Sequence, residues 1–317
     1  MANGGLIGPV KVVETPVTKI TTFNSSGTFQ KKNCTSTIPE VMVVAGGGAG
    51  GNDSGGGGGA GGYRTATSVC MPTGEIAVTV GGGGAKAPAT SHGGSGSNSV
   101  IACVMTSAGG GGAGTPQSTP QVGVAGGSGG GGGPSNHNGG AGNTPPTSPS
   151  QGNAGGQGAS GPNCGGASGG GGGASAVGAN AAVPGSAPTT NMGGCGGAGA
   201  PNDITGCNVT YAGGGGGKRA YTPGSGIAVP VGGAGGAGGG GAGGAQGAPT
   251  GTPASVNTAA VDGTANLGGG GGGGQNNHAG GAGGSGIVVI KETTPKCASG
   301  VWSINEHFDN VKNDTWI

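Results

Sequence analysis

Apolar residues are concentrated in a few short β-branched runs near the two ends of the chain. The run from Val41 to Val44 is continuously apolar and leads into a glycine tract, so it predicts a strand that is buried on both faces. Similar runs, which predict further strands, lie at 20–23, 26–29, 63–69, 75–80 and 99–105. A last run at 286–291 follows a long interval, and we expect it to pair with the early strands.

Between the predicted strands, side chains recur at every third residue. This Gly-Gly-x repeat is clearest at 192–198, where only Met192, Cys195 and Ala198 carry side chains, and at 279–285. Three residues is the period of a polyproline-II helix, which makes no internal backbone hydrogen bonds. Glycine on two of the three faces lets neighbouring helices approach and bond to one another. We therefore expect the x positions to face solvent or a packed side.

The two patterns together predict a fold that is mainly β and irregular. A β-strand frame encloses a glycine-rich bundle of polyproline-II (polyglycine-II) helices, and one short C-terminal α-helix follows. We expect four regions along the chain. They are an extended arm at 1–18, a strand-rich frame at 19–105, the bundle with display loops and the closing strand at 106–291, and the C-terminal helix region at 292–317.

The C-terminal region carries the signature of a helix start. Ser303 is a suitable N-cap, and Glu306 lies three residues later, as in a capping box. A helix this short is marginal alone and needs a docking partner. The apolar residues that serve as candidate attachment residues are Trp302, Ile304, Phe308, Val311 and Trp316. They predict either a lid on the same chain or a plug into another subunit or a neighbouring copy.

Glycine supplies 93 of the 317 residues, far above the usual share of about 7%. Collagen requires a strict Gly-X-Y repeat with abundant proline, and here the Gly-Gly-x register breaks repeatedly. Disorder of the kind seen in flexible Gly/Ser linkers is the main alternative. Charged residues are only 7% of the chain, and strands at both ends require order between them, so we favour a folded bundle.

The net charge of +1 gives no basic surface for nucleic acid, and no apolar run is long enough to insert in a membrane. The first residues lack the pattern of a signal peptide, so we expect cytoplasmic assembly. Seven cysteines without a C-x-x-C motif indicate neither a zinc site nor a complete disulfide framework. A bridge between Cys195 and Cys207 stays open.

No arrangement of residues predicts catalysis, a metal or a cofactor. Gly-x-Gly-x-x-Gly is uninformative at this glycine content. The stretch 213–219 imitates a phosphate-binding loop, but Ala212 and Arg219 depart from that motif. The four histidines lack the H-E-x-x-H spacing of a metal site. We therefore expect a protein that is not an enzyme.

One central cluster combines cations with aromatic rings: Lys218, Arg219 and Tyr221, with Tyr211 nearby. Aromatic faces beside long donors suit the recognition of sugars, so these are candidate receptor-contact residues. The alternative is that both tyrosines cap glycine helices and shield the backbone from water. Further candidates are Asn136 and His137, which lie in the Pro/Asn-rich segment 134–153.

Several stretches resemble the glycine-rich domain of phage tail and tail-fibre proteins. Their order and spacing match over about 20–290, and the matching stretches are 26–29, 41–48, 61–64, 78–82, 210–216 and 283–290. The opening residues 4–8 and the tryptophan-containing residues 299–316 are similar to elements of structural proteins of marine phages. Receptor loops are not carried over, because only the general composition corresponds to that of phage adhesins.

The resemblance implies a virion structural protein at a tail fibre or tail tip that contributes to host attachment. The expected partners are other virion proteins, bound through the C-terminal residues, and a host cell-surface glycan or outer-membrane protein, bound through the loops. A homo-oligomer, such as a trimer, is a further expectation. The alternative from another class is a secreted or surface glycine-rich structural protein, either ice-binding or fibre-forming. The missing signal-peptide pattern argues against that alternative.

Overall fold

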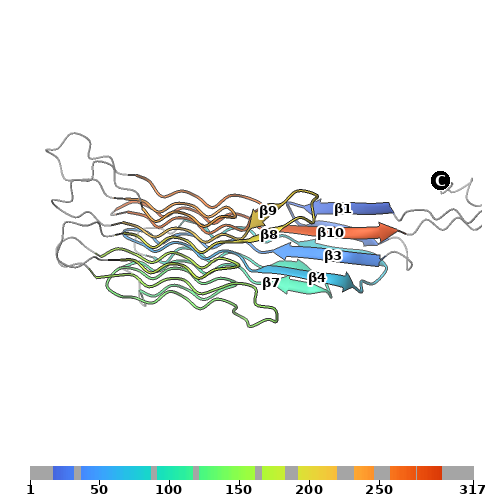
Figure 1. Ribbon diagram of the computed structural model, residues 1–317, viewed down its shortest axis with the longest axis horizontal. Helices are drawn as coiled ribbons and strands as arrows, with labels where there is room; N and C mark the ends of the chain where they lie inside the picture. The colour runs from blue at the N-terminus through green and yellow to red at the C-terminus, as the bar shows by residue number, and fades with distance from the viewer. Residues whose placement is uncertain are drawn as a thin grey trace, which may run out of the picture.

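The computed structural model describes residues 17–31, 37–86, 91–116, 121–160, 166–182, 192–219, 232–245, 258–275 and 277–294. These residues form an elongated body with β-strands at one end, from which glycine-rich segments run in parallel rows along the long axis (Figure 1). We call each such row a pass, and the two ends of the body the sheet end and the loop end.

Ten strands lie at the sheet end of the described chain. They are β1 (Val17–Phe23), β2 (Gly27–Lys31), β3 (Thr37–Val44), β4 (Tyr63–Val69), β5 (Gly74–Thr79), β6 (Ser99–Ile101), β7 (Met105–Ser107), β8 (Ala200–Asn202), β9 (Val209–Tyr211) and β10 (Ile287–Thr294). They form one sheet in the order β1-β10-β3-β4, a second in the order β2-β5-β6-β7, and the hairpin β8-β9.

The last strand returns to the first ones, as predicted. β10 lies between β1 and β3 and is antiparallel to both, with Ile290 opposite Val41. At the far end of this ladder, Val17 is opposite Thr294. The described chain therefore starts and stops at the same place on the sheet.

The first sheet is covered on both faces, which explains its continuously apolar strands. On one face, Val41 and Val288 pack in a core with Phe29, Ile76 and other residues of the second sheet. On the other face, Met42, Val44 and Val289 pack against Ile204 and Tyr211 of the β8-β9 hairpin and its connection. The sheet end is thus a layered core with the first sheet in its middle.

Three features of the sheet end differ from the sequence-based expectation. The predicted strand at 99–105 is a hairpin of β6 and β7, because Cys103 adopts a left-handed turn conformation with φ 61°. The hairpin of β8 and β9 lies at 200–211, a segment for which the sequence pattern predicts no strand and whose proline and polar residues are typical of a connection. Residues 17–18 of the predicted arm belong to β1. The rest of that arm and the predicted C-terminal helix with its five attachment residues lie outside the described residues.

In pass 55–62, successive backbone N–H groups donate to three neighbouring passes in a repeating order. The N–H groups of Gly56, Gly57 and Gly58 donate to Gly114, Gly169 and Gly271, and the next three donors repeat the same order of neighbours. The carbonyl groups of this pass accept from three other passes, at 45–51, 128–131 and 215–218. A repeat of three residues is the period expected for polyproline-II geometry. With three passes that accept from it and three that donate to it, this pass has six bonded neighbours.

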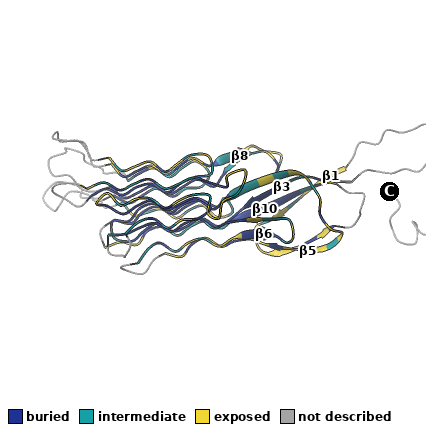
Figure 2. Cartoon of the chain, turned by 90° about the horizontal axis from the view of Figure 1, so that it is seen from below, coloured by how far each residue is buried: buried dark blue, intermediate teal, exposed yellow. Residues whose placement is uncertain are grey.

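The passes form concentric layers around pass 55–62. An inner ring is made by passes 45–51, 108–115, 128–133, 166–174, 212–219 and 268–274, each bonded to the next. The remaining described passes form an outer layer, at 81–86, 91–98, 121–125, 137–143, 151–159, 176–182, 192–199, 232–237, 238–245, 258–264 and 278–286. Figure 2 shows buried residues running along the interior and exposed ones along the outside.

Position in these layers explains which glycine pattern occurs where. The uninterrupted glycine runs at 55–59, 129–133, 169–173, 213–217 and 268–274 all lie in the centre or the inner ring. Neighbours surround these runs, and a Cβ added to their glycines would meet the backbone of another pass. The Gly-Gly-x passes lie in the outer layer, where Met192, Cys195 and Ala198 are exposed and the glycines face inward. The predicted orientation of the x positions is therefore confirmed, as is the mainly β and irregular fold class.

Candidate functional site

The loop end is the candidate site, because turns between passes converge there on the central pass. The turn 52–54 joins the inner pass 45–51 to the central pass. The backbone N–H of Asp53 donates to the carbonyl of His278 (3.2 Å), and that of Asn277 donates to the Asp53 carboxylate (2.9 Å). The turn 52–54 is therefore held against residues 277–278 at the middle of this end.

Ser54 joins the central turn to two inner passes. The Lys218 ammonium group donates to Ser54 Oγ (3.0 Å), and the Ser168 hydroxyl donates to the Ser54 carbonyl (2.6 Å). Ser54 also has φ 73°, a left-handed conformation that is uncommon for a residue other than glycine. These contacts fix the turn 52–54 from two sides, so the centre of the loop end is preformed.

Lys218 and Arg219 support the interior of the loop end. Their exposed fractions are only 1% and 8%. Burial lowers the pKa of the Arg219 guanidinium below its usual range. In the described structure, Arg219 Nε has no hydrogen-bond partner. Because neither cation reaches the surface, we do not assign receptor contact to these two side chains.

Tyr211 lies at the opposite end of the same pass, seven residues from Lys218, or about 22 Å at the rise of a polyproline-II helix. It is 3% exposed and packs in the core beneath β8-β9. The predicted cluster of cations and aromatic rings is therefore not assembled by these residues. The alternative interpretation of Tyr211, as an apolar cap at the start of a glycine pass, agrees with its position. Tyr221 lies outside the described residues.

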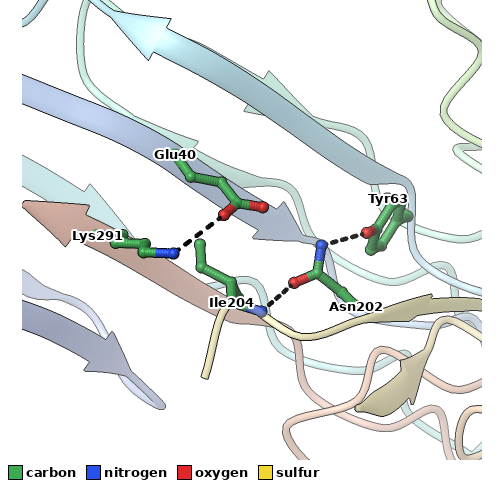
Figure 3. A network of polar contacts seen from close by, with 5 residues as sticks. All are labelled: Glu40, Tyr63, Asn202, Ile204 and Lys291. Atoms are coloured by element: carbon green, nitrogen blue, oxygen red, sulfur yellow. Dashed lines mark hydrogen bonds and ion pairs between the residues drawn. The ribbon is translucent and has the colours of Figure 1, made fainter. Parts of the chain in front are cut away.

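A polar network ties the β8-β9 hairpin to the first sheet near this core (Figure 3). The side-chain amide of Asn202 donates to the Tyr63 hydroxyl (2.9 Å), and its oxygen accepts the Ile204 N–H (2.8 Å). Burial raises the pKa of the Tyr63 phenol, although the bond from Asn202 opposes this. Close by, Lys291 and Glu40 form an ion pair at 3.8 Å. This network holds the hairpin in place and leaves the sheet end as a support.

Asn136 and His137 lie at the loop end and stay candidates for receptor contact. Asn136 is exposed and His137 is half-buried. The Asn136 side-chain oxygen accepts the Ser160 N–H (3.2 Å), and its carbonyl accepts from the Gln157 side chain (2.8 Å). Asn136 has φ 64°. The turn is thus held by bonds to the segment 157–160, and Asn136 is exposed on it.

We predict that Asn136→Ala lowers the free energy of unfolding by about 1–2 kcal/mol, because it removes one hydrogen bond and places alanine in a left-handed conformation. Asn136→Gly is the matched variant: it loses the same hydrogen bond, but glycine tolerates this φ, so it should cost less. Urea unfolding of the two variants measures the difference. Equal losses would contradict a role for backbone conformation in this turn.

Residues 52–54 were not among the predicted site residues. Their polar triplet between two glycine tracts does predict a turn. Its place at the centre of the loop end depends on six neighbouring passes, drawn from residues 45 to 274, and no local pattern encodes that order.

The chemistry of the described loop end is that of polar turns on a rigid support. Within the described ranges, no three His, Cys, Asp or Glu side chains are grouped so that they could hold a metal ion. The same residues include no helix with the length and apolar character needed to cross a bilayer.

No curated protein matches the sequence. A sequence model described as a glycine-rich domain matches residues 24–292, a range that begins just before β2 and includes most of β10. The match therefore covers β2 to β9, most of β10 and the layered bundle of passes, and leaves out β1. The chain belongs to this family of glycine-rich domains.

Proposed function

We propose that this chain is a non-enzymatic structural protein of a phage virion, a tail-fibre or tail-tip component that holds its loop end toward a bacterial surface. The observation that supports the proposal is that the two ends of the body differ. Val17 and Thr294 are paired at the edge of one sheet, so the chain continues in both directions from the sheet end. The turns at 52–54 and 134–136 lie at the other end.

The bundle suits the role of a rigid support. Each interior pass bonds to neighbours on all sides, and a pass of eight residues spans about 25 Å at about 3.1 Å per residue. Turns on a stiff scaffold lose little entropy when they bind a partner. In this proposal the exposed turn at Asn136 faces a host glycan or outer-membrane protein. Residues 302–316 would contact other virion proteins, and the assembled location would be the virion.

The test is a phage in which residues 299–317 of this chain are deleted. Particles should lose the protein, whereas the isolated shortened chain should unfold at the same temperature as the full chain, because residues 17–294 contain the sheets and the described bundle. Immunoblots of purified particles and thermal unfolding measure the two results. A control particle carrying Ala279→Ser on an exposed pass should keep full occupancy. Unchanged occupancy after the deletion would refute attachment through this segment.

The second candidate is a secreted or surface structural protein, either ice-binding or fibre-forming. It is favoured by one observation, the regular rows of small exposed side chains on the outer passes, such as Cys195 and Ala198 or Ala234 and Ala237. Thermal hysteresis or fibre formation by the purified chain would support it over the virion role.

A further inference from the structure

One side of the outer layer is free of charge. It consists of passes 176–182, 192–199 and 232–237, which we call the uncharged face. The Ala179 N–H donates to Cys195 (2.9 Å) and the Gly196 N–H donates to Ala234 (2.8 Å), so the three passes are bonded side by side. None of the residues in these passes is charged. Elsewhere in the outer layer, Lys86 and Asp262 form an ion pair at 2.9 Å.

The side chains on this face are mostly apolar and exposed. Val177 and Met192 are 63% and 56% exposed, and they are two of the five large apolar side chains exposed in the described structure. The smaller exposed members are Ala179, Ala182, Cys195, Ala198, Ala234 and Ala237. Along a pass these side chains recur about every 9 Å, three times the rise of a polyproline-II helix. The face is therefore a regular apolar surface.

Backbone groups also remain unpaired on the middle pass. The N–H groups of Cys195 and Ala198 and the carbonyl groups of Gly193 and Gly196 make no hydrogen bond within the described structure. Donors and acceptors thus both recur with a three-residue spacing. An outer pass with unpaired groups resembles the edge strand of a sheet, which is a template for pairing with another chain.

We infer that the uncharged face docks against the same face of a second copy of this chain. Two copies related by a two-fold axis present matched rows of small side chains, and neither contributes a charge that would repel the other. A charged partner would gain no ion pair here. The same axis brings unpaired donors of one copy toward unpaired acceptors of the other. Cys195, in the middle of the central row, lies near the axis and faces its counterpart.

The size of the face indicates a weak dimer. Three passes about 25 Å long, with outer axes about 10 Å apart, cover roughly 400 Å² per copy once side chains are included. A stable interface buries about 800 Å² per partner. We therefore expect association that depends on concentration and that strengthens where copies are held close together. This inference does not depend on a virion role.

The test is sedimentation velocity of the full chain between about 10 μM and about 500 μM, concentrations that bracket a weak dimer. The unmodified chain should shift toward dimer as the concentration rises. The double variant Ala198→Lys with Ala234→Lys should stay monomeric, because it places ammonium groups on both copies. The matched control, Ala279→Lys with Ala282→Lys, alters another outer pass and should dimerise like the unmodified chain. Thermal unfolding confirms that both variants are folded.

Cys195 provides a second readout that does not rely on introduced charge. Mild oxidation should produce a disulfide-linked dimer that is lost in Cys195→Ser and retained in Cys207→Ser. A monomer at the highest concentration, or equal loss of dimer in the face variant and the control, would overturn the inference. Thermal hysteresis by a monomeric chain, abolished only in the face variant, would assign this face to ice and overturn it too.

Discussion

Replacing Gly215 with alanine is expected to unfold the bundle or to destabilise it by about 4 kcal/mol or more. Gly215 lies in the inner ring, and a Cβ there would fall inside contact distance of the Gly271 carbonyl oxygen. The obstacle is backbone, which cannot rotate away as a side chain can. Overpacking alone costs about 1–3 kcal/mol. Separating the passes also weakens the bonds that Gly215 makes with Gly58 and Gly171, each contributing about 1 kcal/mol.

The matched control is the same substitution at Gly82. This glycine is exposed in an outer pass, and a Cβ added to it would meet no atom within 4 Å. Gly82→Ala should leave stability unchanged or raise it by up to about 1 kcal/mol, because alanine restricts the unfolded chain. Thermal and urea unfolding of the two variants give the comparison. If both substitutions had the same effect, the layered packing of the passes would be refuted.

The contrast between Gly215 and Gly82 also shows that a glycine's layer decides its role in the fold. The Gly-Gly-x repeat was the most visible signal in the sequence, and it predicts three-fold helices. In the structure the longest stretches of the repeat mark outer passes, at 192–199 and 278–286, and only short stretches of it reach the inner ring, as at Ser128. The uninterrupted runs of five or more glycines, which look less informative, mark the interior, since six neighbours leave no face free. Layer position could thus have been predicted from the longest glycine runs, including 213–217.

The long strands of the sheet end could be predicted from their local sequence, whereas the hairpin β8-β9 depends on long-range contacts. The apolar run in β3 predicts burial on both faces, and the similar run in β10 predicts its partner. The hairpin β8-β9 was missed because Ala200–Asn202 contains a proline and only three residues. Its stability comes from packing on Met42 and Val289, which lie far away in the chain. Such contacts are not encoded in the local pattern of either segment.

The site was less predictable than the fold. Charge and aromatic character made Lys218, Arg219 and Tyr211 look like one surface cluster, because the sequence places them within nine residues. Since a pass is extended, those residues are spread between its two ends. Inner-ring packing buries the two cations, and the core under the hairpin buries Tyr211. Short sequence separation does not mean proximity in a three-fold helix that rises about 3.1 Å per residue. Asn136 belongs to a turn that leads into an outer pass, which is why its exposure could be anticipated from its loop composition.

Replacing Tyr211 with alanine is expected to cost about 3–5 kcal/mol, the range for removing a buried aromatic ring. The ring is 3% exposed and packs with Met42, Val44 and Ile204 in the core between the first sheet and the hairpin. Its loss leaves a cavity where pass 212–219 begins. Urea unfolding measures the loss, and Tyr211→Phe is the control that keeps the ring.

The phenylalanine variant separates packing from recognition. If Tyr211 acts through its ring, Tyr211→Phe should cost less than about 1.5 kcal/mol, because the change nearly conserves volume. Adsorption of particles carrying this variant should also stay unchanged, since its hydroxyl does not reach the surface that we propose for the host. A phenylalanine variant that folds normally but loses adsorption would return Tyr211 to the receptor-contact residues. Host recognition would then have to involve the sheet end. This would contradict the proposed function, in which the loop end faces the host.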